Sequence, residues 1–220
     1  MLTLLIATRN IHKVEEIQAI LGAEFHCLTL KEFSDVPSVV EDAETFAGNA
    51  TKKAAELAKW MTSANSQLEI RNLKLDFVLA DDSGLEVDVL NGAPGVHSAR
   101  FAALDQNKNS KDADNNAKLL HLLKDVPLEQ RTGRFRCVIA LAPVGSWKTE
   151  TENCQCFDGA CAGRIQLVAS GQGGFGYDPL FVPDGFTQSF AELGEDVKNK
   201  LSHRAKALAK LKLFFSSQKH

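Results

Sequence analysis

The sequence has no uninterrupted apolar run close to the roughly 20 residues that a membrane-spanning helix needs. Its first residues, MLTLLIATRN, lack the basic start and the cleavage site of a secretion signal, and they are typical of a strand instead. The 220 residues are 44% hydrophobic and 24% charged, which allows a buried core and excludes the disordered, collagen-like and coiled-coil classes. We therefore expect a globular protein with no membrane partner.

Cysteine and net positive charge are also scarce. Five cysteines, an odd number in a chain too long to depend on disulfide bonds, suit a reducing compartment and predict a cytoplasmic protein. A formal net charge of -3 argues against a nucleic-acid partner, because capture of nucleic acid usually needs a basic face. A phosphorylated small molecule stays open as a ligand, since a few lysines in one cleft do not show in the total charge.

The sequence lacks two common motifs of catalytic sites, and its cysteines do not have the spacing of a zinc site. Neither the phosphate-binding loop GxxxxGK[ST] nor the nucleophile elbow GxSxG occurs. Cys154, Cys156 and Cys161 have no matching His or Cys group at the spacing of a zinc site, so packing is the favoured role for them. Covalent catalysis by a serine or cysteine nucleophile is therefore poorly supported.

Residues 171–176 fit the dinucleotide-binding pattern GxGxxG, but the residues that follow exclude that role. Pro179 and Pro183 prevent the helix whose N-terminus would face a pyrophosphate. The remaining interpretation is a glycine loop that carries Phe175 and Tyr177, which suit stacking on a flat ligand. Structural packing of the two rings is an equally good alternative.

Local patterns predict one α/β domain over residues 1–220. A strand over 2–7 precedes a polar turn and a helix over 14–21, with Asn10 as its N-cap and Gly22 as its end. The further predicted elements are helices over 45–61, 111–124 and 200–214, a polar surface connection over 63–74, strands over 77–80 and 85–89, and an antiparallel meander within 132–170 with turns at Gly145 and Gly163.

Asp81 and Asp82 follow a short apolar strand in the segment ADDSG. Two neighbouring carboxylates repel each other, and a divalent cation relieves this repulsion. Mg²⁺ prefers such oxygen ligands together with substrate phosphates. The alternative is a solvated turn in which Ser83 and Gly84 are the turn formers.

Two cationic segments begin helices. Thr8, Arg9 and Asn10 with Lys13 would place a hydroxyl, an amide and positive charge at a helix N-terminus, where phosphates bind, although an ordinary capped helix is the favoured alternative. The segment 198–204, KNKLSHR, offers several donors in one turn, against the alternative of a solvated helix start. Together with the paired carboxylates, these segments describe a magnesium-dependent nucleoside triphosphate site.

Five motifs in order along nearly the whole chain resemble the inosine triphosphate pyrophosphatase family. They are ATRN at 7–10 with Lys13, TF at 45–46 with Asn49, Ala50 and Lys53, LADDSGLEVDVLNGAPGVHSARF at 79–101, GGFGYDPLF at 173–181, and KNKLSHRAKAL at 198–208. The resemblance implies an α/β fold with an elongated mixed β-sheet flanked by helices, two lobes with the active-site cleft between them, and a homodimer. It also implies Mg²⁺-dependent conversion of ITP, dITP and XTP to the monophosphate and pyrophosphate.

The resemblance also assigns roles to individual residues. Asp82 would be the catalytic acid/base. Arg9 stands where many members have glycine, which puts a side chain where those members offer backbone. Metal ligation is implied for Asp82, Asp81 and the glutamate ahead of the second helix, for which Glu41 matches best and Glu44 is the less favoured choice. The other roles implied are phosphate binding by Thr8, Asn10, Lys13, Lys53 and Ser83, purine stacking by Phe175, contacts to the nucleoside by Gly176, Tyr177 and Asp178, and reading of the base by Lys198, His203 and Arg204.

Two other functions stay open at this point. A Maf-like pyrophosphatase acting on other modified nucleotides would share the fold and the metal chemistry, but it should lack the segment Ser202-His203-Arg204. A non-catalytic nucleotide-binding module would bind without turnover, and the intact pair of aspartates argues against it. Hydrolysis by a water molecule attacking the α-phosphorus is the function that the residues favour.

Overall fold

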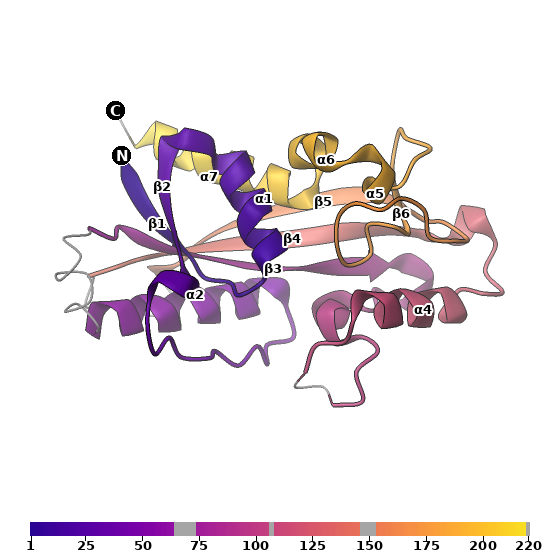
Figure 1. Ribbon diagram of the computed structural model, residues 1–220, viewed down its shortest axis with the longest axis horizontal. Helices are drawn as coiled ribbons and strands as arrows, with labels where there is room; N and C mark the ends of the chain where they lie inside the picture. Colours follow the sequence, from indigo (N-terminus) through magenta and orange to yellow (C-terminus); the bar gives the residue numbers. More distant parts are fainter. Residues whose placement is uncertain (64–73, 106–107, 146–152, 219–220) are drawn as a thin grey trace. The chain divides into compact units, whose positions relative to one another are not determined.

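The computed structural model describes residues 1–63, 74–105, 108–145 and 153–218 (Figure 1). The predicted connection at 63–74 therefore lies largely outside the described residues. The helices are α1 (Ile11–Leu21), α2 (Phe46–Ser63), α4 (Asp112–Leu122), α5 (Phe190–Leu193), α6 (Glu195–Leu201) and α7 (His203–Ser217). The strands are β1 (Leu2–Ile6), β2 (Phe25–Thr29), β3 (Phe77–Val87), β4 (Thr132–Pro143), β5 (Gln155–Ile165) and β6 (Phe181–Pro183).

The strands form one mixed sheet in the order β2-β1-β3-β4-β5-β6. β1 is parallel to both β2 and β3, whereas β5 and β6 are antiparallel. The consecutive residues Leu4 and Leu5 are both completely buried, so both faces of β1 are covered. A strand with two covered faces needs a continuous apolar run, which is what the start of the sequence provides. The expected mixed α/β fold is confirmed.

The chain divides into two compact units, each made of separate segments. The first unit comprises Met1–Asp82, Val138–Asp158 and Ala207–His220, and the second comprises Ser83–Cys137 and Gly159–Lys206. β3, β4 and β5 each contribute residues to both units. A single domain over the whole chain stays a prediction.

In the first unit, α2 lies on one face of the strands, and α1 and α7 lie on the other (Figure 1). The Asn10 side chain accepts hydrogen bonds from the first backbone N–H groups of α1, and Gly22 ends the helix with φ +64, so both predicted ends are confirmed. The Phe215 ring of α7 lies 5.5 Å from that of Phe25 and 5.4 Å from that of Phe77. α7 therefore packs against the apolar core next to β2 and β3.

The second unit has an aromatic core. Phe181 lies 4.7 Å from Phe135 and 5.5 Å from Phe190, measured between ring centroids. The Phe135 ring also stacks on that of His203 at 4.8 Å. The buried members of this cluster are Leu85, Val87, Leu119, Leu123, Phe135, Cys161, Ile165, Tyr177, Leu180, Phe181 and Phe190.

One correction concerns the segment with the two aspartates. The sequence predicts two strands interrupted by a turn, but β3 runs without a break from Phe77 to Val87. Asp81 and Asp82 are only 1% and 6% exposed, so they are not part of a solvated turn. Lys13 pairs with Asp81 and Asn49 donates to Asp82, and contacts with such distant residues cannot be read from local turn preferences.

Further corrections concern a glycine and a strand end. Gly163 lies inside β5 and not in a turn, whereas Gly145 has the positive φ of +84 that a turn glycine adopts. The apolar alternation at 165–169 is not a strand, because β5 ends at Ile165 and both Leu167 and Val168 are exposed.

The predicted helix over 200–214 is also wrong, because it is two helices that meet at Ser202. This residue has extended backbone, with ψ 166, and its hydroxyl accepts a hydrogen bond from Ala205 N–H at 3.2 Å. Ser202 therefore ends α6 and caps α7.

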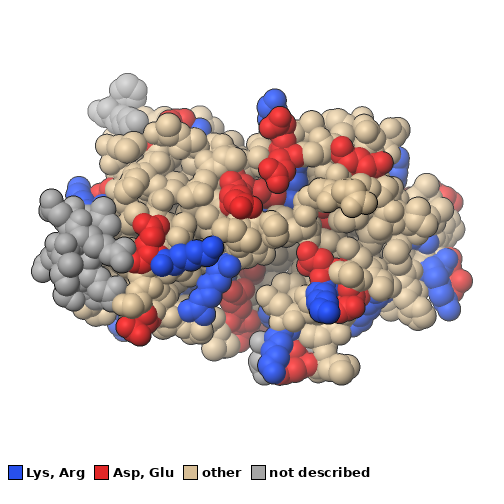
Figure 2. All heavy atoms as spheres, viewed as in Figure 1, with Lys and Arg blue, Asp and Glu red and all other residues tan. Residues whose placement is uncertain are grey.

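The described surface carries mixed charge. Acidic and basic side chains are interspersed on the face in Figure 2, and no broad basic field covers it. Among the helices of the described segments, none has both the length and the apolar character that crossing a membrane requires.

The close approach of β6 to β5 generates a stability prediction. A Cβ atom on Gly163 would lie 2.4 Å from the carbonyl oxygen of Val182, so Gly163→Ala must displace backbone. We expect the free energy of unfolding to fall by about 1–3 kcal/mol, as in overpacked cores. Urea denaturation measures this, with Ala162→Ser, an exposed neighbour, as the control. Equal stability of both variants would contradict the close approach.

Candidate active site

The turn after β1 is organised by hydrogen bonds within the chain. The Thr8 hydroxyl accepts from Asn10 N–H at 3.2 Å, and the Asn10 amide oxygen accepts from the N–H groups of His12 and Lys13 at 3.0 and 3.3 Å. These contacts fix the start of α1 with backbone donors near its N-terminus, where anions are stabilised. The capped helix that the sequence favoured is therefore present, and phosphate binding by this turn stays a prediction.

Arg9 makes different contacts from those expected. Its guanidinium donates to the carbonyl oxygen of Val36 at 2.9 Å and to the Ser38 hydroxyl at 3.0 Å. Arg9 thus ties the turn to the segment that leads to Glu41. The structure gives the side chain this role within the protein, and its predicted contact with phosphates stays a prediction.

Lys13 and Lys53 meet the carboxylates of the first unit. The Lys13 ammonium lies 2.5 Å from Asp81 Oδ1, and the Lys53 ammonium lies 2.5 Å from Glu41 Oε1. Lys53 also donates to the main-chain oxygen of Asp81 at 3.3 Å. The structure therefore brings together four residues that the sequence singled out: Lys13, Lys53, Asp81 and Glu41.

The two aspartates have partners on different helices. Asp81 binds Lys13 of α1, whereas Asp82 Oδ2 accepts from Asn49 Nδ2 of α2 at 3.1 Å. Successive side chains of a strand point to opposite faces, and α1 and α2 cover opposite faces of this part of the sheet (Figure 1). The adjacent carboxylates are therefore separated by the pleat of the strand.

Burial raises the pKa of Asp82 to about 6. The charge of Glu41 raises it further, while Lys13, Lys53 and the hydrogen bond from Asn49 lower it. A carboxyl group that titrates near neutrality can both accept and release a proton under ordinary conditions. Among the residues of this unit, Asp82 has the properties of a general base.

The acidic residues are compatible with a divalent cation, although few of them converge. Within the described ranges, no group of three His, Cys, Asp or Glu residues is placed to hold a metal. The repulsion between Glu41 and Asp82 is nevertheless the kind that a cation relieves, and Mg²⁺ usually needs only one or two carboxylates with substrate phosphates. The donor set therefore fits Mg²⁺ in the presence of a phosphate ligand.

In the second unit, Asp178 organises the glycine loop. Its Oδ2 accepts from Phe175 N–H at 2.8 Å and lies 2.5 Å from the Lys198 ammonium. A Cβ atom on Gly174, where φ is +72, would lie 2.3 Å from that same oxygen, so the loop requires glycine there. The half-buried Phe175 ring is held by this network, with the Lys198 ammonium 4.4 Å from its centroid.

The structure separates the roles of the loop's aromatic residues. Tyr177 is 3% exposed, and its hydroxyl donates to the carbonyl oxygen of Ser98 at 2.9 Å. The prediction that its ring stacks on a flat ligand is therefore wrong, and of the two rings Phe175 stays the candidate. Gly176 N–H donates to Asp112 Oδ2 at 2.7 Å.

The cationic segment before and within α7 is buried and not solvated. Lys198, His203 and Arg204 are 3%, 4% and 1% exposed. Arg204 Nη2 donates to the Ser83 hydroxyl at 2.9 Å, and its guanidinium carbon lies 5.9 Å from the Phe175 centroid. Burying cations is costly unless they are paired or used, so this arrangement favours the functional interpretation over the solvated helix start. Ser83 holds Arg204 here, and its contact with phosphates stays a prediction.

Asn49 is the site residue whose role the motifs did not reveal. It is 1% exposed, donates to Asp82 and accepts from Ala43 N–H at 2.9 Å. A buried asparagine is unusual on the apolar face of a helix, and this position between Phe46 and Ala50 was the signal that could have found it.

Comparison with known proteins gives one consistent result. The model of the Ham1 family matches residues 4–214. The dITP/XTP pyrophosphatase of Desulforamulus reducens is 46% identical over 94% of this chain and 92% of its own length, and that of Geobacter sulfurreducens is 46% identical over 96% of each. The Ham1 protein of Staphylococcus aureus superposes with a TM-score of 0.78 at 30% identity, covering 98% of this chain and 99% of its own.

The raised pKa of Asp82 predicts a pH-dependent stability. With EDTA present, Asp82→Asn should raise the free energy of unfolding at pH 8 by about 1–3 kcal/mol, because ionising this buried carboxyl destabilises the folded state. The penalty begins above the usual value of 3.8 and is complete above about pH 6, so the gain should vanish at pH 3.5.

Urea denaturation at the two pH values measures this difference. Asp125→Asn, at an exposed position, is the matched control and should change neither. A loss of stability in Asp82→Asn at pH 8 would show that Lys13 and Lys53 outweigh the burial of the carboxylate.

Proposed function

Because this chain belongs to the Ham1 family, we propose that it hydrolyses the non-standard purine nucleotides ITP, dITP and XTP to the nucleoside monophosphate and pyrophosphate. The observation that carries the proposal is Asp82, a buried carboxylate of β3 whose pKa burial raises to about 6 and which lies within the electrostatic influence of Lys13 and Lys53. A Maf-like pyrophosphatase is not favoured, since the Ham1 model matches residues 4–214 and the segment Ser202-His203-Arg204 is present.

The residues of the first unit would act on the triphosphate. Asp82 accepts a proton from a water molecule, the water oxygen forms a bond to the α-phosphorus, and the bond from this phosphorus to the bridging oxygen breaks. Pyrophosphate leaves with the electron pair of that bond. Lys13 and Lys53, with the turn at Thr8 and Asn10, stabilise the negative charge on the phosphate oxygens, because such reactions depend mainly on positioning and charge neutralisation.

Mg²⁺ is part of the proposal. Asp82 and Glu41 would hold it, with Asp81 beside them, and it would supply neutralisation of the carboxylates and of the phosphate oxygens. Asp81 already has a cationic partner within the protein, because the Lys13 ammonium lies 2.5 Å from its Oδ1. A cytoplasmic location, predicted from the cysteines, and a homodimer, implied by the resemblance, are further predictions.

The residues of the second unit would recognise the base. Phe175 stacks on the purine, with Gly176, Tyr177 and Asp178 at the nucleoside. His203 and Arg204, with Lys198, present donors to the keto oxygen at position six of hypoxanthine or xanthine. The amino group of adenine would leave these donors unsatisfied, which costs a few kcal/mol.

The reaction is tested by its products. The purified protein should convert ITP to IMP and pyrophosphate in the presence of Mg²⁺, with little reaction on ATP or in EDTA. Asp82→Asn should lower kcat by at least about 10²-fold, the usual contribution of a general base, whereas the exposed control Asp125→Asn should not. Release of IDP and orthophosphate would place attack at the terminal phosphate and overturn the mechanism.

Base selectivity is a separate prediction. Arg204→Ala should reduce the ratio of kcat/KM for ITP over ATP by about 10- to 100-fold, because a donor to the keto oxygen is lost. Arg204 is buried, so general damage to folding would lower both values together and leave the ratio unchanged. The exposed Arg164→Ala is the matched control. An unchanged ratio in Arg204→Ala would refute the role of Arg204 in base reading.

A further inference from the structure

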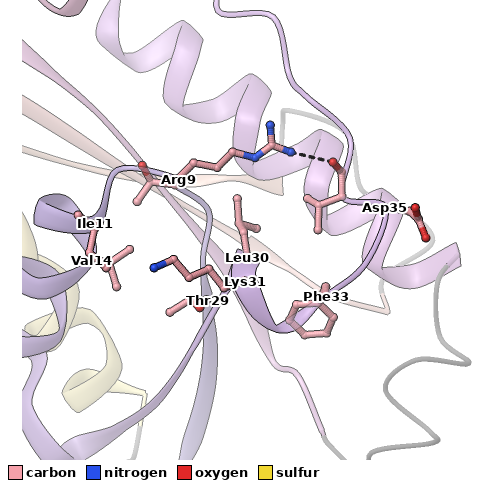
Figure 3. A pocket seen from close by; sticks show the side chains of 10 residues that line it. Arg9, Ile11, Val14, Thr29, Leu30, Lys31, Phe33 and Asp35 are labelled. Atoms are coloured by element: carbon pink, nitrogen blue, oxygen red, sulfur yellow. Dashed lines mark hydrogen bonds between the residues drawn. The ribbon is translucent and has the colours of Figure 1, made fainter. Parts of the chain in front are cut away.

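The first unit contains a pocket whose lining includes none of the carboxylates and lysines assigned to the reaction. It lies beside the carboxyl ends of β1 and β2, and its volume is about 460 Å³ (Figure 3). This volume falls within the range of small-molecule sites in proteins. The pocket is lined by Thr8, Arg9, Ile11, Val14, Thr29, Leu30, Lys31, Phe33, Asp35 and Val36.

Much of the lining is apolar. Ile11 and Val14 come from α1, while Leu30 and Phe33 come from the segment that follows β2. Val14 and Phe33 are buried, but Ile11 is 41% exposed and gives the pocket an apolar edge open to solvent. Such a surface gains free energy when a ligand with an apolar body covers it.

The polar groups of the pocket are mainly positive. Among the described residues, none forms a hydrogen bond or an ion pair with the Lys31 ammonium. Figure 3 shows this side chain extending across the pocket toward Val14, whereas the Asp35 carboxylate points away from it. The Lys31 ammonium next to the apolar lining can therefore form an ion pair with one negatively charged group of a ligand.

Arg9 gives the pocket a fixed rim. Its side chain spans one side of the pocket and its guanidinium donates to the carbonyl oxygen of Val36, the contact drawn in Figure 3. This hydrogen bond connects the turn after β1 to the segment after β2, so the two walls are held at a set distance. The rim also adds a second positive charge to that of Lys31.

We propose that this pocket binds a small organic anion with an apolar, ring-sized body, whose charged group meets Lys31. The carboxylates and lysines assigned to the reaction, Lys13, Lys53, Asp81 and Asp82, are absent from its lining. The pocket is thus a second ligand site next to the phosphate turn, with which it shares Thr8 and Arg9. The proposal is independent of the reaction, because binding can be measured in the absence of any nucleotide.

The probe is 8-anilinonaphthalene-1-sulfonate, which combines aromatic rings with one negative charge and fluoresces in apolar surroundings. We expect saturable binding of one molecule per chain to the folded wild-type protein. Lys31→Glu should weaken this binding about tenfold, because a charged hydrogen-bond partner is replaced by a repelling group. Lys59→Glu makes the same charge change at an exposed lysine on α2 outside the pocket, and it should bind as the wild type does.

A second variant tests the pocket without changing charge. Leu30→Trp, at a partly buried lining position, should fill the space and abolish the binding, while circular dichroism shows that the fold is intact. Binding that is unchanged in both Lys31→Glu and Leu30→Trp, or that is not saturable, would overturn the proposal. Competitive displacement of the probe by a non-hydrolysable ITP analogue would also overturn it, because the pocket would then belong to the substrate site.

Discussion

The ion pair between Lys13 and Asp81 is the interaction on which the polar half of the first unit depends. Asp81 lies inside a strand and is 1% exposed, so its charge would cost several kcal/mol without a partner. Lys13, in the first turn of α1, supplies that partner, with its ammonium 2.5 Å from Asp81 Oδ1. The pair fixes the start of α1 beside β3, the strand that also carries Asp82.

β3 also carries Asp82, a carboxyl group whose ionisation is disfavoured by its burial. Asp82 is buried with one amide donor from Asn49, and its pKa of about 6 shows that the folded state tolerates its charge poorly. Groups that are destabilising when isolated are concentrated where ligands bind, since a ligand can later supply the missing compensation. In the second unit, Asp178 already provides such compensation for Lys198.

The sequence predicted the elements whose signals are local. The capped first helix, the helix around Ala54 and the first strand depend on residues close to them in the sequence. The continuity of β3 could not be predicted, because Lys13 and Asn49 stabilise it from distant positions. Gly163 was misread for a similar reason, since its partner Val182 is far along the chain.

For the candidate site, too, the sequence predicted what local residue patterns show and missed what depends on contacts between distant residues. Motifs identified Asp82, Phe175 and Arg204, because residue type and order are visible in a sequence. They did not distinguish the half-buried ring of Phe175 from the buried ring of Tyr177, because burial arises only in the folded chain. They also did not identify Arg9 as a hydrogen-bond donor to Val36 and Ser38. The sequence therefore indicated the chemistry well and the geometry incompletely.

The division of the chain into interleaved segments has a consequence for synthesis in the cell. The first unit needs residues after Ala207 to complete its core, since Phe215 contacts Phe25 and Phe77. Until α7 has been synthesised, Phe25 and Phe77 lack the ring of Phe215. The first unit therefore cannot complete its core before α7 is made, and a chain cut before α7 would leave these two apolar rings without that partner.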